Sequence, residues 1–247
     1  MNHKESNDEL GKEAELDRVA FYGRTLLEYQ KFFKLSDPDL LNFPKIIDCP
    51  AGASSFVSEM YSRKNYDIEV VGCDPIFGTS MENLKSIGYR DISYVTEKVS
   101  SSPNFYNWDF YKSIDFLKNQ RTLALEKFLS DYNQGLSQKR YLKASLPNLP
   151  FDDKTFDLVL SGHFLFTYSN KFDLEFHVSS ILELFRICSR QVRIYPIQQR
   201  SSKPYPFMDE IYSKLKEMEI KFDIVTVPFE FQKGSNKMLL LERQRQG

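Results

Sequence analysis

The sequence predicts an α/β protein whose sheet is doubly wound, mostly parallel and seven-stranded, and closes with an antiparallel C-terminal hairpin. Three observations predict this fold. Short apolar runs alternate with stretches of helical periodicity. The last two strand-like runs are joined by a short link that contains the turn signal Gly234-Ser235-Asn236. Finally, 247 residues of which 41% are hydrophobic suffice to bury one sizeable core.

The N-terminal part is expected to be a disordered arm over 1–13, followed by a single domain over 14–247. The arm is polar and mixed in charge. From 15 to 35 apolar residues recur at helical spacing, which predicts one or two amphipathic helices ended by the turn signal at 36–39. We expect these helices to form a lid over 14–39.

The central part alternates strands and helices. A helix is expected from the turn after the first strand to Arg63, and two more over 173–188 and 207–219. The expected strands are the run that begins at Lys45, then 68–75, 139–145, 156–166, 191–197, 221–227 and 237–243.

A long helical insertion is expected over 76–138, between the second and third strands. About 60 residues stand where one crossover helix needs far fewer. Its aromatic-rich pattern, NFYNWDFYKSIDFLKNQ, suggests a cap that encloses a small acceptor and excludes water. The alternative is that these helices only extend the core.

Composition excludes several classes of protein. With 33 basic and 34 acidic residues the net charge is −1, which argues against a nucleic-acid-coating protein. Arginines between 186 and 200 leave a basic patch open as an alternative. No apolar run approaches the roughly 18–20 residues that cross a bilayer. The N-terminus has no features of a signal or transit peptide. We therefore expect a cytoplasmic protein with no nucleic-acid or membrane partner; the sequence leaves the oligomeric state open.

The cysteines give no metal site. Cys49, Cys73 and Cys188 are far apart in the sequence, and no CxxC or Cys/His cluster is present. This spacing favours reduced thiols and predicts no metal.

The turn after the first strand is the strongest candidate for a ligand site. Ligands of open α/β sheets bind beyond the carboxyl ends of the strands. The loop DCPAGASSF ends the first strand, and Gly52 can adopt angles closed to other residues. Asp74 ends the second strand, and a carboxylate there can accept hydrogen bonds from both ribose hydroxyls. The fragment predicts a site for an adenosine-bearing ligand.

Two nucleotide classes fit this loop poorly. A dinucleotide fingerprint needs three glycines where this loop has Pro50, Gly52 and Ser54, and Pro50 has no N–H to donate. An NAD-dependent oxidoreductase is therefore a weaker reading. A P-loop is excluded because no GK[ST] is present.

The run Asp48-Cys49-Pro50-Ala51-Gly52-Ala53-Ser54 resembles a degenerate acidic-x-Gly-x-Gly-x-Gly loop of class I S-adenosylmethionine-dependent methyltransferases. Asp74 matches the acidic residue that these enzymes place on the cofactor ribose. The segment SLPNLPFDDKTFDLVLSGHFLF, 145–166, resembles their signature leading into the fourth strand, and the chain's end matches their usual seven-stranded ending. The departures are Pro50 and Ser54 in place of glycines, and Ser145 where many relatives carry Asp next to adenine.

The resemblance implies S-adenosylmethionine as cofactor. The expected cofactor-binding residues are Asp48, Pro50, Ala51, Gly52, Ser54, Asp74, Pro75, Ser145, Leu146, Ser161, Gly162, Tyr22 and Arg24. Each has a plainer alternative: Asp48 as a helix cap, Gly52 and Asp74 as turn formers, and 145–146 as a loop leaving a strand.

The chemistry of methyl transfer indicates which residues could act as a base. Methyl transfer is an in-line displacement in which alignment dominates, and a base is needed only for a protonated, weakly acidic acceptor. His163, at the carboxyl end of the fourth strand, is the first candidate, with Tyr22 and Tyr168 behind it. Arg24 is expected to pair with the cofactor carboxylate from the N-terminal lid. The alternatives are a satisfied histidine at 163 and ordinary surface pairing at 24; His177 is expected to be structural.

These observations predict a methyltransferase that acts on a small molecule. The alternative is a non-catalytic protein of the same fold that binds S-adenosylmethionine or a nucleoside, as a sensor or partner subunit.

Overall fold

The computed structural model describes residues 18–63 and 66–243, and the arm predicted over 1–13 lies outside the described residues. The strands are β1 (Lys45–Asp48), β2 (Glu69–Cys73), β3 (Tyr141–Leu142), β4 (Phe156–Gly162), β5 (Cys188–Tyr195), β6 (Lys221–Thr226) and β7 (Lys237–Glu242). The helices are α1 (Leu26–Phe32), α2 (Asp37–Leu41), α3 (Phe56–Ser62), α4 (Met81–Ser101), α5 (Ile114–Ser137), α6 (Leu174–Arg186) and α7 (Met208–Glu217), with a short 3₁₀ turn, Pro103–Phe105.

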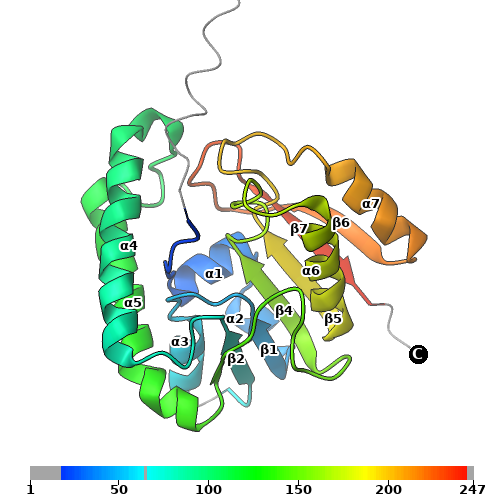
Figure 1. Ribbon diagram of the computed structural model, residues 1–247, viewed down its shortest axis with the longest axis horizontal. Coiled ribbons are helices and arrows are strands. Elements are labelled where there is room, and N and C mark those ends of the chain that lie inside the picture. Colours follow the sequence, from blue (N-terminus) through cyan, green and yellow to red (C-terminus); the bar gives the residue numbers. More distant parts are fainter. Residues whose placement is uncertain (1–17, 64–65, 244–247) are drawn as a thin grey trace, which may run out of the picture.

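The sheet confirms the predicted fold. Its order is β3-β2-β1-β4-β5-β7-β6, parallel except for β7, which pairs antiparallel with both β5 and β6 (Figure 1). The chain moves outward from β1 to β2 and β3 in one direction, and from β4 to β5 in the other. The strand order therefore reverses between β1 and β4, where open α/β sheets bind ligands.

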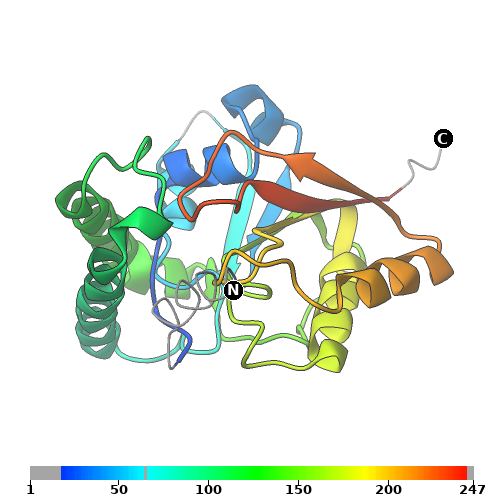
Figure 2. The same ribbon diagram turned by 90° about the horizontal axis from the view of Figure 1, so that it is seen from above.

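Alternating side chains fill two cores, one on each face of the sheet. Ile46, Val70 and Leu158 belong to the core that α1 and α3 cover, which continues into α4 and α5. Ile47 and Val159 belong to the core beneath α6 and α7. Figure 2 shows helices on both sides of the sheet. Burial on both faces explains why the central strands are continuously apolar.

The insertion is helical, as predicted. α4 and α5 lie side by side at one end of the molecule (Figure 1) and are joined by the aromatic turn around Tyr106 and Trp108. That turn packs on Phe231 from the link between β6 and β7, with ring centroids 4.7 Å apart for Tyr106 and 5.4 Å apart for Trp108. The link between β6 and β7 therefore packs on the turn that joins the two insertion helices.

The prediction of helix before residue 26 is wrong for the described part of the segment. Residues 18–25 carry no helix, and α1 begins only after the cap at Thr25. The amides of Ala20 and Phe21 donate instead to the Tyr168 hydroxyl and the Asp91 carboxylate. Tertiary hydrogen bonds thus override a helical pattern of apolar residues.

The turn predicted at 36–39 is the start of a helix. Ser36 caps α2 by accepting from the Asp39 amide at 3.3 Å, and Asp39 accepts from the Ser36 amide at 2.8 Å. Pro38 fits the first helical turn, where its missing N–H costs nothing. The predicted turn residues therefore begin α2, whereas α1 already ends at Phe32, with Phe33 as its C-cap.

Candidate functional site

The turn after β1 is tied to the end of β2 by backbone hydrogen bonds. Gly52 has φ +55°, which favours glycine, and its amide donates to Asp74 Oδ2 at 3.0 Å. The Ala51 amide donates to the carbonyl of Cys73 at 2.9 Å. The sequence-predicted loop and carboxylate are therefore in direct contact.

Asp74 is a buried carboxylate that holds two backbone segments. It is 9% exposed, and Oδ1 accepts from the Ile76 amide at 3.1 Å while Oδ2 accepts from Gly52. Burial raises the pKa of Asp74 to about 6, against the opposing effect of both hydrogen bonds. Near neutral pH the group is mostly ionised.

Asp48 lies deeper, at the end of β1. Its Oδ2 accepts from the Tyr29 hydroxyl at 2.7 Å, and its Oδ1 has no hydrogen-bond partner within the described part of the chain. Burial, reinforced by the nearby Asp74 carboxylate, raises the pKa of Asp48 to about 8. At pH 7 this carboxyl is therefore mostly protonated.

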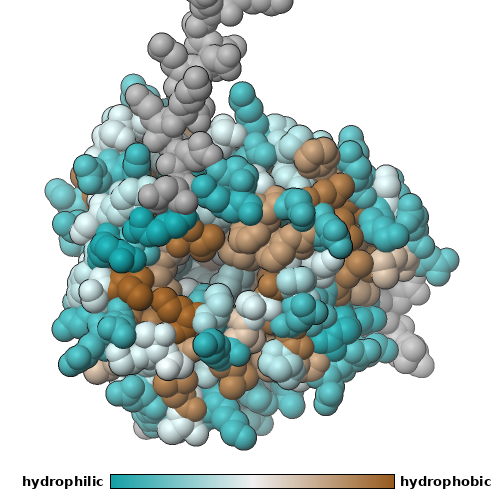
Figure 3. Space-filling model, in the orientation of Figure 1, coloured by the Kyte–Doolittle hydropathy of each residue, from teal (hydrophilic) through white to brown (hydrophobic). Residues whose placement is uncertain are grey.

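Two adjoining cavities lie at the point where the strand order reverses. One is mainly apolar and has a volume of about 330 Å³; the other, called the polar cavity here because more polar groups line it, measures about 120 Å³. They share Val19, Ala20, Pro50, Asp74 and Phe164. Figure 3 shows this face of the molecule hollowed near its centre, with hydrophobic side chains around the hollow.

The apolar cavity collects three of the predicted cofactor-binding residues, Pro75, Ser145 and Leu146. They line it together with Phe172 and Phe176, whose rings stack 4.2 Å apart. Flat apolar walls next to the Asp74 carboxylate suit a planar base joined to a ribose.

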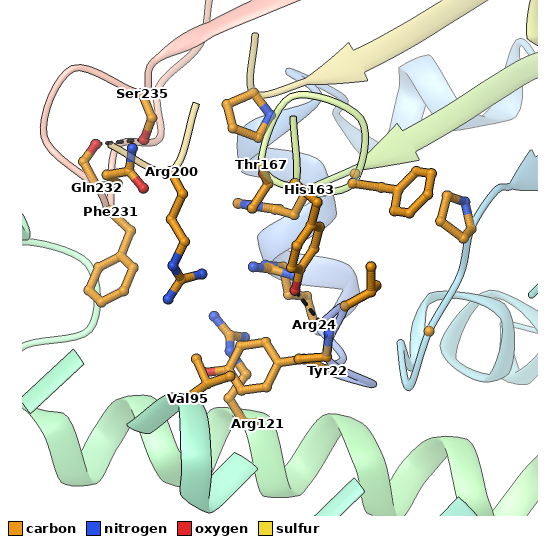
Figure 4. Close-up of a pocket in the computed structure, with 18 of the residues that line it drawn as sticks. Tyr22, Arg24, Val95, Arg121, His163, Thr167, Arg200, Phe231, Gln232 and Ser235 are labelled. Atoms are coloured by element: carbon orange, nitrogen blue, oxygen red, sulfur yellow. Dashed lines mark hydrogen bonds between the residues drawn. The ribbon is translucent and has the colours of Figure 1, made fainter. Parts of the chain in front are cut away.

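The polar cavity is rich in arginine. Arg24 comes from the segment before α1, Arg121 from α5, and Arg200 from the loop between β5 and α7, and all three approach the same space (Figure 4). The Tyr22 ring lies beside two of them, with its centroid 5.6 Å from the Arg24 Cζ and 5.0 Å from the Arg121 Cζ. Burial and then the Arg121 charge lower the pKa of Arg24, whose accessible surface faces the cavity.

Arg121 is held by a buried polar cluster. It is 1% exposed and donates to Glu28 and to the Tyr111 hydroxyl, which in turn donates to Glu28. Burial alone raises the pKa of Glu28, but Arg121, Tyr111 and the amide of Thr25 outweigh it, so the pKa is lowered. Glu28 therefore fixes Arg121 as a charged group.

His163 faces the polar cavity from the end of β4 in a left-handed backbone conformation, φ +54°. Phe32 and Tyr195 pack edge-to-face with its ring, and Nε2 has no hydrogen-bond partner among residues 18–63 and 66–243. Burial, followed by the charges of Arg24, Arg121 and Arg200, lowers the pKa of His163 well below its usual range. The ring is neutral at pH 7.

The other two candidate catalytic residues also line this cavity. The Tyr168 hydroxyl accepts from the Ala20 amide at 3.1 Å, and burial raises its pKa, so it is a hydrogen-bond donor toward the cavity rather than a base. Tyr22 lies between arginines in Figure 4. By contrast, both ring nitrogens of His177 contact backbone carbonyls, those of Asp173 and Leu165, which fits the structural role expected for it.

Most predicted cofactor residues gather at the two cavities. Those in the walls are Tyr22, Arg24, Pro50, Ala51, Gly52, Asp74, Pro75, Ser145, Leu146 and Gly162. Asp48, Ser54 and Ser161 are buried outside both linings. The Ser54 hydroxyl is engaged by the Arg24 carbonyl and the Phe56 amide, whereas that of Ser161 has no partner in the described segments.

Arg121 and Arg200 were not predicted as site residues. A signal for Arg121 exists: with Leu117 and Leu125 it forms the buried stripe of α5, where a charge is unusual. Arg200 has no such signal, because only the path of its loop brings it to the cavity. Within 186–200, Arg186 bonds the Glu183 carboxylate and Arg193 bonds the Phe33 carbonyl, and the alternative of a basic patch stays a prediction.

Residues 18–63 and 66–243 contain no cluster of three His, Cys, Asp or Glu side chains that could hold a metal ion. In the same segments no helix has the length and apolar character required to span a bilayer.

The chain is similar to known proteins in sequence and, more weakly, in structure. No protein-family model matches the chain. The methyltransferase domain of bacterial CtHen1-CN aligns with a TM-score of 0.45 at 13% identity, covering 82% of this chain and 92% of that one. Magnesium protoporphyrin IX methyltransferase from Synechocystis PCC 6803 aligns with a TM-score of 0.43 at 11% identity, covering 84% of this chain and 73% of that one.

A sequence relative is much nearer. Uncharacterized protein MJ0045 of Methanocaldococcus jannaschii is 33% identical over 229 residues, which cover 92% of this chain and 98% of the relative. The chain therefore belongs to the same family as this archaeal protein.

Proposed function

We propose that the chain is an S-adenosylmethionine-dependent methyltransferase that acts on a small molecule in the cleft formed by the two cavities. One observation carries the proposal: the positive-φ Gly52 turn contacts Asp74 where the strand order reverses, beside an apolar cavity. This arrangement supports an adenosine site with the base among Leu146, Phe172 and Phe176 and the ribose at Asp74.

An arginine in the cavity wall supports the same ligand. Arg24 lines the polar cavity, and its guanidinium suits the carboxylate of an amino-acid moiety. Asp48 and Ser161 are buried outside both linings, so they form no part of the cavity walls.

S-adenosylmethionine supplies an electrophilic methyl group when it is bound. The chain's own contribution is to orient the acceptor and exclude water with the insertion and the 18–25 segment. His163 offers a neutral ring nitrogen that can accept a hydrogen bond from an acceptor O–H or N–H. Tyr168, whose proton is retained, can donate one.

A non-catalytic binding protein is the second candidate. It is favoured by Pro50, which has no N–H to donate in the turn after β1. Such a protein would bind the cofactor and use it as a signal.

Calorimetry with S-adenosylhomocysteine, followed by transfer of radiolabelled methyl from S-adenosylmethionine to a panel of small metabolites, tests both candidates. Methyltransferase function requires binding and label in an acceptor. Binding with no transfer to any member of a broad panel would favour the sensor, and absence of binding at millimolar ligand would remove both.

A further inference from the structure

Residues 18–23, called the strap here, lie along both cavities of the proposed site. Val19 and Ala20 line the two cavities. Phe21 lines only the apolar cavity, and Tyr22 lines only the polar one. In Figures 1 and 2 the strap, dark blue, passes between the insertion helices and the sheet. A ligand that spans the two cavities therefore lies against the strap.

One buried carboxylate of α4 holds the strap. Asp91 is 1% exposed, and its Oδ2 accepts from the Phe21 amide at 2.9 Å. Its Oδ1 accepts from the Arg18 guanidinium at 2.7 Å and from that of Arg90 at 3.1 Å. A buried carboxylate is costly unless charges and hydrogen bonds satisfy it. Because the strap supplies two of these three donors, its departure would leave Asp91 less well satisfied.

The other contacts of the strap involve neutral groups. The Ala20 amide donates to the Tyr168 hydroxyl at 3.1 Å, and the Phe21 ring packs edge-on against Phe128 of α5, with centroids 5.8 Å apart. At its end, Gly23 lies against the turn after β1. Hydrogen bonds to an ionised group are stronger than neutral ones, so Asp91 supplies the principal polar contacts. Since the amides of the strap donate to side chains, it can move without breaking a helix or strand.

We propose that Asp91 is a positioning residue that keeps the strap closed over the two cavities, so that a ligand enters and leaves only when the Asp91 contacts open. The inference rests on the proposed function and adds a gate to the same site. Segments that close over a site commonly set the rate of ligand release. Weaker Asp91 contacts should raise the population of the open strap, and with it the rates of both entry and release.

The test is surface plasmon resonance of S-adenosylhomocysteine on the immobilised full chain. Asp91→Ala removes both acceptor oxygens and should raise the association and dissociation rates by about tenfold or more. Asp91→Asn keeps the shape and one acceptor oxygen, so its rates should lie between those of Asp91→Ala and the wild type. Glu97→Ala, on an exposed position of the same helix and outside both linings, should leave the rates unchanged.

The two rates together distinguish a gate from a merely structural contact. Damage to the cavity walls would speed release without speeding association. Wild-type rates in Asp91→Ala, or faster release without faster association, would therefore overturn the inference. If Asp91→Ala does not fold, Asp91→Asn decides by the same criteria.

Amide hydrogen exchange tests the strap independently of the ligand. In Asp91→Ala, peptides that cover 18–23 should exchange about tenfold faster or more than in the wild type, while those of β4 should not change. Unchanged exchange of the strap would overturn the inference whatever the ligand does. Failure of S-adenosylhomocysteine to bind the wild type, with faster strap exchange in the variant, would instead overturn the proposed function and support the role of Asp91.

Discussion

The Tyr29 hydroxyl donates to Asp48 Oδ2 at 2.7 Å, inside a core where the carboxyl has no exposed surface. This hydrogen bond favours the ionised form, yet burial dominates and raises the pKa of Asp48 to about 8. In the unfolded chain an aspartate titrates near 3.9. The folded protein therefore binds a proton that the unfolded chain has already lost at neutral pH.

Asp48→Asn tests this linkage. Because the pKa of Asp48 is raised in the folded protein, the proton bound to its carboxyl stabilises the fold. This contribution is complete below about pH 4 and is lost as pH rises to about 8. The free energy of unfolding of the wild type should fall by up to about 1.4 kcal/mol per pH unit between pH 6 and 8, measured by urea titration. In Asp48→Asn this slope should disappear, while Asp223→Asn, on an exposed position of β6, should keep it. An unchanged slope in Asp48→Asn would show that the Asp48 carboxyl of the wild type titrates normally.

Asp74→Ala should weaken S-adenosylhomocysteine binding by about 1–3 kcal/mol, since hydrogen bonds to a charged group are lost. Calorimetry at pH 7.5 measures the effect, above the pKa of about 6. Glu69→Ala, on an exposed residue at the start of the same strand, is the matched control and should bind as the wild type does. Equal affinities for the two variants would remove Asp74 from the site.

The His163 ring should remain neutral as the pH falls through 6, because burial and the three arginine charges lower its pKa. Imidazole resonances in an NMR pH titration report this directly. The His163→Asn spectrum supplies the assignment, since Asn tolerates the left-handed backbone. Titration of His163 near its ordinary value of about 6.5 would contradict the buried, cationic surroundings.

Glu28→Gln should destabilise the fold by about 3–5 kcal/mol, because Arg121 is left as an uncompensated buried charge. Lys127→Gln removes one partner of the Lys127–Glu59 pair, whose side chains are 40% and 21% exposed, and should cost at most about 1 kcal/mol. Chemical denaturation compares the two. A loss below 1 kcal/mol for Glu28→Gln would mean that Arg121 is satisfied by other groups.

Gly23→Ala should displace the 18–25 segment, since a Cβ at this position would lie 1.8 Å from the carbonyl oxygen of Ala53. We expect a loss of about 1–3 kcal/mol of stability, together with weaker S-adenosylhomocysteine binding. Thermal denaturation measures the loss of stability. At Gly162 the nearest atom to an added Cβ is 3.4 Å away, so Gly162→Ala should lose less stability than Gly23→Ala. Wild-type stability of Gly23→Ala would show that the segment is not held against the Gly52 turn.

The parts of this site that lie near strand ends could be predicted from the sequence. The parts that tertiary packing brings in from distant positions could not. The contact between Gly52 and Asp74 could be predicted because each residue ends a recognisable strand and parallel strands share one edge. The non-helical path near Ala20 could not be predicted, because the Ala20 amide donates to the hydroxyl of Tyr168, which is 148 residues away in the sequence. The place of Arg200 in the cavity wall could not be predicted either, because only the course of the loop between β5 and α7 brings it there.

The walls of the polar cavity are contributed by segments as far apart along the chain as Tyr22 and Ser235. During translation the ribosome must therefore pass position 235 before the pocket can close. A nascent chain that stalls in β5 already contains the Gly52 turn and Asp74, but the loop that bears Arg200 and the link that bears Phe231 are still unmade. The complete wall of the polar cavity thus exists only in chains that already include the link between β6 and β7.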